Sequence, residues 1–379
     1  MAQKSNELKA QGIDVIDMSV GEPDFYTPEP IKRAAQQAID DNYSFYSPVA
    51  GFPDLRKAIC DKLKKENDLD YSPSQIVVSN GAKQSLCNVI LSLVDKGDEV
   101  IIPAPYWVSY PQMVKLAEGV PIFVPTDIEH DFKMTPQQLK AAITPRTKML
   151  ILCSPSNPTG TVYTEEELKA LAEVLREYDD LYVISDEIYE QIRYDGVHRS
   201  IAQFGHIRDR VIIANGVSKG YAMTGWRIGW IAAPQAVASA CSLLQGQYTS
   251  GPSSVSQRAA LAAYTGTQEC VAEMRRVFER RKELIVKLLG AVPGLKANIP
   301  KGAFYIFPDC SVYMGRSYNG KTIDTAGDLA MYLLEEAHVA CVGGDAFGAP
   351  GHIRLSYASS EEKITKAVTR IKAALEKLH

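Results

Sequence analysis

The sequence predicts an α/β protein with a large domain, in which a mostly parallel seven-stranded sheet lies between helices, and a smaller α+β domain built from both ends of the chain. Two observations predict the large domain. Short β-branched runs alternate with longer helical patterns, and these runs are continuously apolar. Such strands are typical of a parallel sheet that helices cover on both faces. A change of pattern after residue 267 predicts the second domain.

The elements of the large domain follow in order along the chain. Helical patterns occupy residues 82–94, 135–142 and 164–178. The third of them begins at Thr164 with Glu167 three residues later, which is the spacing of a helix capping box. The apolar runs expected to form the seven strands are 76–78, 100–102, 122–124, 149–152, 181–184, 211–213 and 228–232.

The smaller domain is expected after one long charged helix at 267–290, which Gly290 and Pro293 end. Short strands at 303–307, 339–342 and 352–357 then mix with helices at 324–337 and 361–378. A helical stretch at 28–41 precedes the first sheet strand, so we expect the start of the chain to join this domain. The expected division is 1–42 and 291–379 for the small domain, 43–268 for the large domain and 269–290 for the interdomain helix.

Composition excludes several classes of protein. The 379 residues are 46% hydrophobic and 23% charged, which is typical of a folded protein of roughly two domains. The 41 basic and 45 acidic residues give a formal charge of -4, so no basic excess points to nucleic acid. The N-terminus lacks a signal peptide's apolar stretch, and Pro234 and Gln235 interrupt the longest apolar segment, 228–244, so we expect no membrane partner.

Cysteine and histidine usage bears on the cellular compartment and on metal binding. The seven cysteines are scattered without a C-x-x-C pair, which suits a reducing compartment, and we expect a cytoplasmic protein. The six histidines show no H-E-x-x-H motif and no close ligand spacing, so no metal site is expected.

A phosphate-loop pattern, G-x-x-x-x-G-K-[ST], occurs at residues 315–322. Such a loop needs a buried strand directly before it, and Pro308 breaks the only candidate. We therefore expect a polar surface hairpin here.

A hydrolase nucleophile pattern, G-x-S-x-G, occurs at residues 216–220 and follows a predicted strand. A nucleophile elbow leads into a long helix, whereas Gly225 and Gly229 and a new strand follow here. A serine hydrolase with Ser218 as nucleophile and His338 or His352 as base remains the alternative from another class of enzyme. A binding module without turnover is a further alternative.

A third interpretation centres on Lys219, and it draws in segments from most of the chain. The segment around this lysine reads SKGYAMTGWRIG over residues 218–229. Seven further segments are 21–25 (GEPDF), 46–51 (YSPVAG), 80–84 (NGAKQ), 105–110 (PYWVSY), 154–160 (SPSNPTG), 185–189 (SDEIY) and 352–357 (HIRLSY). In this order and spacing the chain resembles the aspartate aminotransferase family, the pyridoxal-phosphate enzymes of fold type I.

The chemistry of that cofactor requires an amine and a carboxylate, and the sequence offers one candidate for each. Its aldehyde needs an amine that can be both tether and proton carrier, and Lys219 is the candidate. Its pyridine nitrogen stays protonated only beside a carboxylate in a poorly solvated place. Asp186 ends an apolar strand, where parallel sheets bind ligands, and Glu187 would point to the opposite face.

The resemblance implies the other cofactor contacts. Asn157 and Tyr189 would contact the phenolic oxygen, with Tyr189 counted as catalytic beside Lys219 and Asp186, and Trp107 would stack on the ring. The phosphate would bind the start of a helix, where free amides meet the positive end of a dipole. The phosphate-binding residues so implied are Gly81, Ala82, Lys83 and Arg227, with Tyr46 reaching in from the neighbouring subunit of a homodimer. Ser218 is a further cofactor-binding candidate, and its contact with the phosphate stays open.

One position departs from the family pattern. Many relatives carry a serine three residues before the lysine as a phosphate ligand, and this chain has Gly216.

The resemblance also implies the substrate contacts. Arg354 would hold the α-carboxylate, a group that arginine binds with two hydrogen bonds, and Gly21 would offer a backbone amide. Lys83 matches a lysine that meets the distal carboxylate of aspartate or glutamate in one bacterial branch; its alternative is a lysine that points to solvent. Trp107 and Asn157 complete the expected substrate site.

The activity so implied is transfer of an amino group from aspartate to 2-oxoglutarate, with amino acids and 2-oxo acids as partners. Prephenate, alanine or aromatic aminotransferases and a carbon-sulfur lyase of the same fold are the alternatives. Relatives begin with an extra segment that helps to close over the substrate, and this chain starts close to the point where that segment would end.

Overall fold

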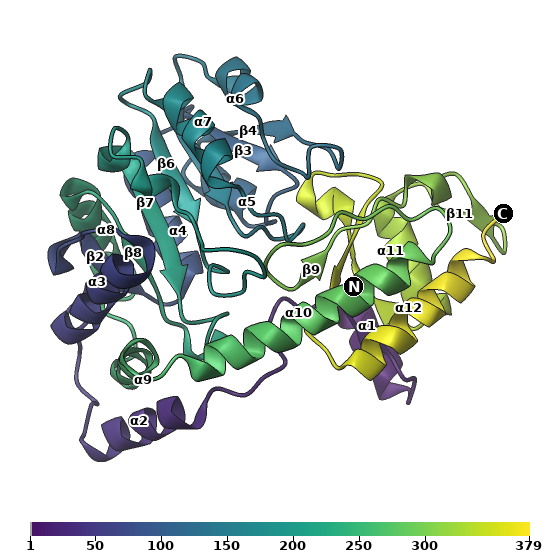
Figure 1. Ribbon diagram of the computed structural model, residues 1–379, viewed down its shortest axis with the longest axis horizontal. Helices are drawn as coiled ribbons and strands as arrows, with labels where there is room; N and C mark the ends of the chain where they lie inside the picture. Colours follow the sequence, from purple (N-terminus) through teal and green to yellow (C-terminus); the bar gives the residue numbers. More distant parts are fainter. Residues whose placement is uncertain (1) are drawn as a thin grey trace.

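A seven-stranded sheet forms the centre of the larger part of the computed structural model, which describes residues 2–379 (Figure 1). Its strands are β2 (Ile76–Ser79), β3 (Glu99–Ala104), β4 (Val120–Pro125), β5 (Thr147–Cys153), β6 (Tyr182–Asp186), β7 (Val211–Gly216) and β8 (Gly229–Ala232). Their order is β2-β8-β7-β6-β5-β3-β4, and β8 alone runs antiparallel to its neighbours. The prediction of a mostly parallel seven-stranded sheet is confirmed.

Successive residues of these strands pack into two hydrophobic cores, one on each face of the sheet. Val100 and Ile151 pack on one face of the sheet, whereas Ile101 and Leu150 pack on the other. Helices cover both faces, which explains why the strands are continuously apolar. The first face is covered by α4 (Ala82–Leu93), α5 (Tyr110–Leu116) and α8 (Gln235–Tyr248), and the second by α3 (Pro53–Asn67), α6 (Pro136–Ala142), α7 (Glu165–Leu175) and α9 (Ser254–Thr265).

The helix α10 (Glu269–Gly290) runs from the larger part of the molecule to the smaller one (Figure 1). The smaller part contains a three-stranded antiparallel sheet in the order β13-β14-β9 and a parallel pair, β1-β12. Its remaining helices are α1 (Ala2–Ala10), α11 (Ala326–Glu336) and α12 (Glu361–Leu375), and its strands are β1 (Ile16–Asp17), β9 (Tyr305–Ile306), β12 (Val339–Ala340), β13 (Val342–Gly343) and β14 (Ile353–Ser356).

The first forty residues divide between the two parts of the molecule. Strand β1 pairs with β12 in the smaller part. Helix α2 (Glu29–Asp40) instead lies beside α9, and its buried Ile31 and Ala35 belong to a core under the large sheet (Figure 1). The domain boundary expected at residue 42 stays a prediction.

The phosphate-loop and hydrolase motifs have the structural surroundings that the sequence predicts. Residues 317–322 form an antiparallel hairpin, β10 (Ser317–Tyr318) and β11 (Lys321–Thr322), with Asn319 and Gly320 in the left-handed conformation that such tight turns need. After Ser218 the chain makes a short 3-10 turn, Thr224–Trp226, and enters β8 without a long helix.

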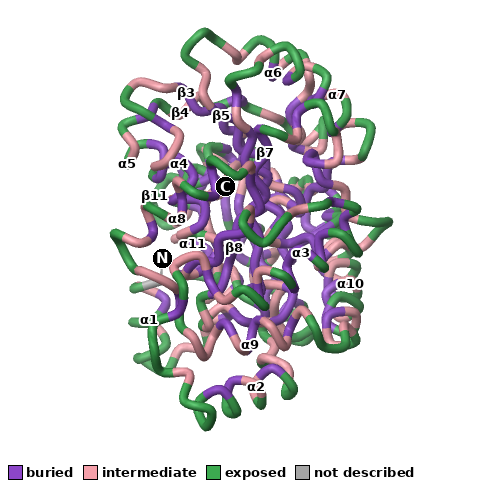
Figure 2. Tube along the Cα trace, turned by 90° about the vertical axis from the view of Figure 1, so that its left-hand side faces the viewer, coloured by how far each residue is buried: buried purple, intermediate pink, exposed green. Residues whose placement is uncertain are grey.

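Burial is concentrated where the strands lie, and exposed residues gather on the outer loops and on α2 (Figure 2). All seven cysteines are free thiols. Across residues 2–379, every helix is too short or too polar to span a bilayer.

Candidate active site

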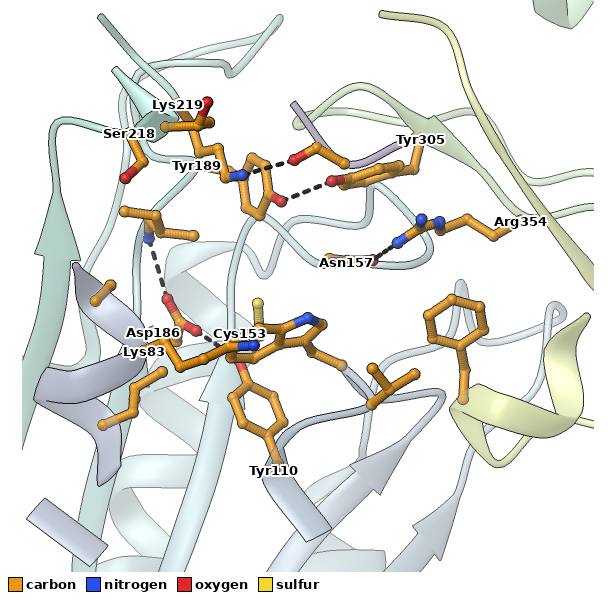
Figure 3. Close-up of a pocket in the computed structure, with 18 of the residues that line it drawn as sticks. Lys83, Tyr110, Cys153, Asn157, Asp186, Tyr189, Ser218, Lys219, Tyr305 and Arg354 are labelled. Carbon is orange, nitrogen blue, oxygen red and sulfur yellow. Dashed lines mark hydrogen bonds between the residues drawn. The ribbon is translucent and has the colours of Figure 1, made fainter. Parts of the chain in front are cut away.

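The carboxyl ends of β5, β6 and β7 meet at one edge of the sheet and open into a pocket of about 460 Å³ (Figure 3). Such an edge is where open α/β sheets bind ligands. Eleven residues singled out in the sequence line this pocket: Gly21, Ala82, Lys83, Trp107, Asn157, Asp186, Tyr189, Ser218, Lys219, Arg227 and Arg354.

Two other predicted residues lie elsewhere. Gly81 is the N-cap of α4, directly beside the pocket residue Ala82. Tyr46 is 96% exposed and lies outside this chain's own pocket.

Lys219 follows β7 and reaches into the pocket (Figure 3). Its Nζ donates a hydrogen bond to the carbonyl oxygen of Gly21 at 2.6 Å and lies 5.9 Å from the centre of the Tyr189 ring. Burial lowers the pKa of Lys219 to about 8. A larger fraction of this lysine is therefore neutral than of a lysine in water, and the neutral amine is the nucleophilic form.

Asp186 is the last residue of β6 and is buried. Its carboxylate accepts hydrogen bonds from the Tyr110 hydroxyl at 2.6 Å and from the Ile188 amide at 3.3 Å (Figure 3). Burial raises the pKa of Asp186 to about 6, while the Tyr110 hydrogen bond acts to lower it. The group can therefore be a carboxylate near neutral pH, and a cation that approached it would favour that form further.

Glu187 lies on the other side of the same backbone. It accepts hydrogen bonds from the hydroxyls of Ser185 and Ser200 and contacts His198, and it does not line the pocket. Of the two neighbouring carboxylates, the pocket receives only Asp186, as the alternation of strand residues predicts.

The N-terminus of α4 and Arg227 lie together at one side of the pocket. Gly81 has a φ of 83°, and a Cβ there would overlap the Arg227 guanidinium. No side chain caps α4, so its first amides remain available to an acceptor. The Arg227 guanidinium donates to the carbonyl oxygens of Thr224 at 2.7 Å and Asn80 at 3.4 Å. Free amides beside a guanidinium suit an anion.

The structure gives a reason for the departure at Gly216. A Cβ at this position would lie 2.7 Å from the Ile228 carbonyl oxygen and 2.8 Å from the Gly229 Cα. Residue 216 therefore has little room for any side chain.

Arg354 lies in β14 and is only 7% exposed. Its guanidinium donates to Asn157 Oδ1 at 2.9 Å and to the Ser19 carbonyl oxygen at 2.5 Å, whereas its Nε is buried without a partner. A buried cation next to only neutral oxygens lacks a counter-ion. This position therefore suits a carboxylate ligand.

Lys83 points over the pocket aromatic Trp107, with its Nζ 4.9 Å from the ring centre. Lys83 thus lines the pocket, although it is an exposed residue. Trp107 also meets the ring of Tyr110 edge-on, with centroids 5.4 Å apart.

Several pocket residues were not predicted from the sequence. Tyr110 bonds to Asp186, Cys153 ends the neighbouring strand β5, and Tyr305 bonds to Tyr189 at 2.8 Å. Val342 and Phe347 line the pocket from the smaller part of the molecule. Tyr110 lay within a segment that carried the resemblance, and the position of Cys153 at a strand end was a usable signal. No sequence signal marked Tyr305 as a pocket residue, because its strand has only two residues.

Comparisons with known proteins agree along the whole chain. A family model described as aminotransferase class I and II matches residues 13–371. A probable aspartate/prephenate aminotransferase of Rhizobium leguminosarum bv. phaseoli is 47% identical over 98% of this chain and 94% of its own.

Solved structures are equally similar. The aspartate aminotransferase of Rhizobium meliloti superposes with a TM-score of 0.97 at 43% identity, covering 100% of this chain and 95% of its own. That of Thermus thermophilus, solved with maleate, gives a TM-score of 0.92 at 42% identity over 98% of this chain and 95% of its own.

Proposed function

The chain belongs to the class I and II aminotransferases and is therefore a transferase of amino groups, and we propose that it moves the amino group of aspartate to 2-oxoglutarate. The observation that carries the proposal is a pair of cationic side chains, Arg354 and Lys83, that line one pocket with Lys219. Aspartate and 2-oxoglutarate each carry two carboxylates, so one such pocket suits both. The name of the Rhizobium leguminosarum relative supports the same donor.

The family implies pyridoxal phosphate, and the pocket residues fit that group. Lys219 supplies an amine of lowered pKa, and Asp186 supplies a buried carboxylate with a hydrogen-bonded orientation. The uncapped start of α4 and Arg227 suit the phosphate. When bound, the cofactor withdraws electrons from the substrate α-carbon and so makes its proton removable.

We assign the remaining roles to side chains of the same pocket. Asp186 keeps the ring nitrogen protonated, Asn157 and Tyr189 hydrogen-bond the phenolic oxygen, and Trp107 covers the ring. Ser218 adds a polar group close to Lys219.

On the substrate side, Arg354 holds the α-carboxylate, with Asn157 hydrogen-bonded to it and Gly21 of the N-terminal segment lining the same pocket. Lys83 holds the distal carboxylate, and Trp107, whose ring lies under the Lys83 ammonium, forms a wall of the same pocket. With the cofactor bound, the Lys219 Nζ would take up the proton that leaves the substrate α-carbon, as its lowered pKa allows. Two half-reactions at one site predict ping-pong kinetics.

Our proposal includes a homodimer in which Tyr46 completes the site of the neighbouring subunit. Four strongly exposed aromatic residues, Tyr26, Phe45, Tyr46 and Tyr248, support it, because a contact with a second subunit would remove large apolar side chains from water. Seven free thiols support a reducing compartment, such as the cytoplasm.

An amino-donor panel with 2-oxoglutarate tests the activity. Purified protein reconstituted with pyridoxal phosphate should be yellow and should transfer nitrogen from aspartate, and Lys219→Ala should abolish the transfer. Activity with alanine or an aromatic donor and none with aspartate would reject the proposed substrate. Colourless protein with esterase activity lost in Ser218→Ala would instead support the hydrolase.

Prephenate is the second oxo-acid acceptor to test. The name of the Rhizobium leguminosarum relative includes it, and Val342, Phe347 and Trp107 give the pocket apolar walls that suit a ring-bearing acid. Transfer from aspartate to prephenate at a rate comparable with that to 2-oxoglutarate would support a dual acceptor range.

A further inference from the structure

Tyr305 contacts two groups that the proposed function assigns to different tasks. It is fully buried in β9 and lines the pocket. Its hydroxyl lies 2.8 Å from the hydroxyl of Tyr189 (Figure 3). Its ring lies beneath the guanidinium of Arg354, with 4.6 Å between Cζ and the ring centre.

These contacts join the two parts of the molecule. Tyr189 follows β6 of the large sheet, whereas Arg354 lies in β14 of the small sheet, next to β9. The N-terminal segment lies against the same hydroxyl, because a Cβ at Gly21 would be only 2.8 Å from it. Tyr305 is thus the point at which the large sheet, the small sheet and the N-terminal segment meet.

We propose that Tyr305 is a positioning residue with two separable actions: its hydroxyl orients the hydroxyl of Tyr189, and its ring holds the guanidinium of Arg354 in place for the substrate carboxylate. This inference rests on the proposed function and deepens it by adding a residue that acts through two others.

The action of the hydroxyl follows from the number of hydrogen bonds that a phenol can donate and accept. A phenol has one proton to donate and can also accept. When Tyr305 donates to Tyr189, the proton of Tyr189 is free to be donated into the pocket. The Tyr189 ring is also fixed edge-on by the rings of Phe304 and Tyr305, so its hydroxyl has a defined direction.

The ring action follows from the surroundings of Arg354. Aromatic rings lie near its guanidinium at 4.6 Å for Tyr305 and 5.1 Å for Phe347. Asn157 and the Ser19 carbonyl oxygen take two of its donors, and the Nε remains without a partner. Cation–π contact of this kind is strongest where water is excluded. It stabilises the group while leaving a donor for a ligand.

Two substitutions separate the actions. Tyr305→Phe removes the hydroxyl and keeps the ring, and Tyr305→Leu removes both. Tyr332→Phe is the matched control, because it also removes a buried hydroxyl of the smaller part, one that donates to the Ala374 carbonyl oxygen. Should Tyr305→Leu fail to fold by circular dichroism, Tyr305→Met takes its place, since it also lacks an aromatic ring.

The first readout is the pH titration of the visible absorbance of the bound cofactor. In Tyr305→Phe the apparent pKa of this absorbance change should rise by about 0.5 to 1 unit. This is the size expected when one hydrogen bond to the phenolic oxygen of the cofactor weakens. Tyr332→Phe should titrate like the wild type. A titration curve of Tyr305→Phe that matches the wild type would overturn the hydroxyl action.

The second readout is the dissociation constant of maleate, a dicarboxylate with no amine to react. Tyr305→Phe should bind maleate within about threefold of the wild type, whereas Tyr305→Leu should bind it about tenfold more weakly. Equal affinities in wild type and Tyr305→Leu would overturn the ring action. A wild-type protein that takes up no pyridoxal phosphate would instead reject the proposed function itself.

Discussion

At the residue scale, the pocket keeps two groups of opposite charge away from water. Burial raises the pKa of Asp186 and lowers that of Lys219, so each charged form is disfavoured in the protein without cofactor. A bound cofactor that offers a cationic nitrogen to one and an aldehyde to the other would relieve both costs. Perturbed groups that converge in one pocket are typical of functional sites.

This leads to a prediction for the stability of the cofactor-free protein. Between pH 3.8 and about 6 the folded state holds a proton on Asp186 that the unfolded state has released, so the free energy of unfolding falls as pH rises through this window. Asp186→Asn removes that loss. The stability of Asp186→Asn relative to wild type should therefore rise by up to about 3 kcal/mol from pH 4 to pH 7.5.

Urea denaturation of both proteins without cofactor at the two pH values measures this change. Asp61→Asn is the control, because that carboxyl is exposed on α3, pairs with Lys57 and does not line the pocket. A difference between Asp186→Asn and wild type that stays constant with pH would contradict the prediction.

Lys83 gives a prediction about specificity. Lys83→Ala should lower kcat/KM for aspartate by about 10- to 100-fold, because the proposed charge-assisted bond to the distal carboxylate is lost, and should leave alanine nearly unchanged. Steady-state rates with both donors measure the selectivity. Lys321→Ala, in the exposed hairpin, should affect neither donor. Equal losses for aspartate and alanine would remove Lys83 from substrate recognition.

At the element scale, the sheet could be predicted because its inner strands are buried on both faces and therefore continuously apolar, whereas the edge strand β4 is partly exposed yet still rich in apolar residues. Several helices could not. The α3 sequence is interrupted by charges and even buries Lys62, which pairs with the buried Glu190. The α8 and α9 sequences are rich in small residues, such as Ala238 and Ala260, whose helical periodicity is weak. Tertiary packing decides such segments more than local pattern does.

The site could be predicted to the extent that its residues follow strand ends. Asp186 ends a sheet strand, and Asn157 and Lys219 follow the ends of two neighbouring strands within four residues, so topology brings them together. Tyr305 and Phe347 come from short elements of the smaller part of the molecule. Their approach depends on how the two sheets pack, which a linear pattern does not contain.

The N-terminal segment offers a prediction at this scale. Arg281 of α10 holds Asp24 with two hydrogen bonds, at 2.6 and 2.9 Å, and lies over the rings of Phe25 and Phe278. Arg281→Gln should loosen residues 19–27 above the pocket. We expect faster amide hydrogen exchange in that segment and a KM for aspartate raised about tenfold or less, with a smaller change in kcat.

The neighbouring arginine provides the control. Arg280 is exposed and lies 3.7 Å from Glu361, so Arg280→Gln should leave exchange in residues 19–27 and the KM unchanged. If Arg281→Gln exchanged at the wild-type rate in this segment, the salt bridge would have no part in holding it.

At the scale of the whole molecule, the exposed aromatic residues argue for association. Tyr26, Phe45 and Tyr46 lie at the two ends of α2, with exposures of 93%, 82% and 96%. Leu243 and Tyr248 of α8 are also exposed. Apolar groups of this size are normally covered, and a second copy of the chain would cover them while bringing Tyr46 to a pocket.

Mixed dimers test this arrangement. Lys219→Ala and Tyr46→Ala homodimers should each be impaired, the first in chemistry and the second in cofactor retention at limiting pyridoxal phosphate. A hybrid of the two has one pocket with both changes. Its other pocket combines Lys219 from one subunit with Tyr46 from its partner, and so should behave as wild type. Subunit exchange should therefore restore about half of the wild-type activity for each hybrid dimer.

If Tyr46 acted on its own subunit's pocket, every pocket in the hybrid would carry one defect, and mixing would restore nothing. Homodimers mixed without subunit exchange give the baseline against which recovery is measured.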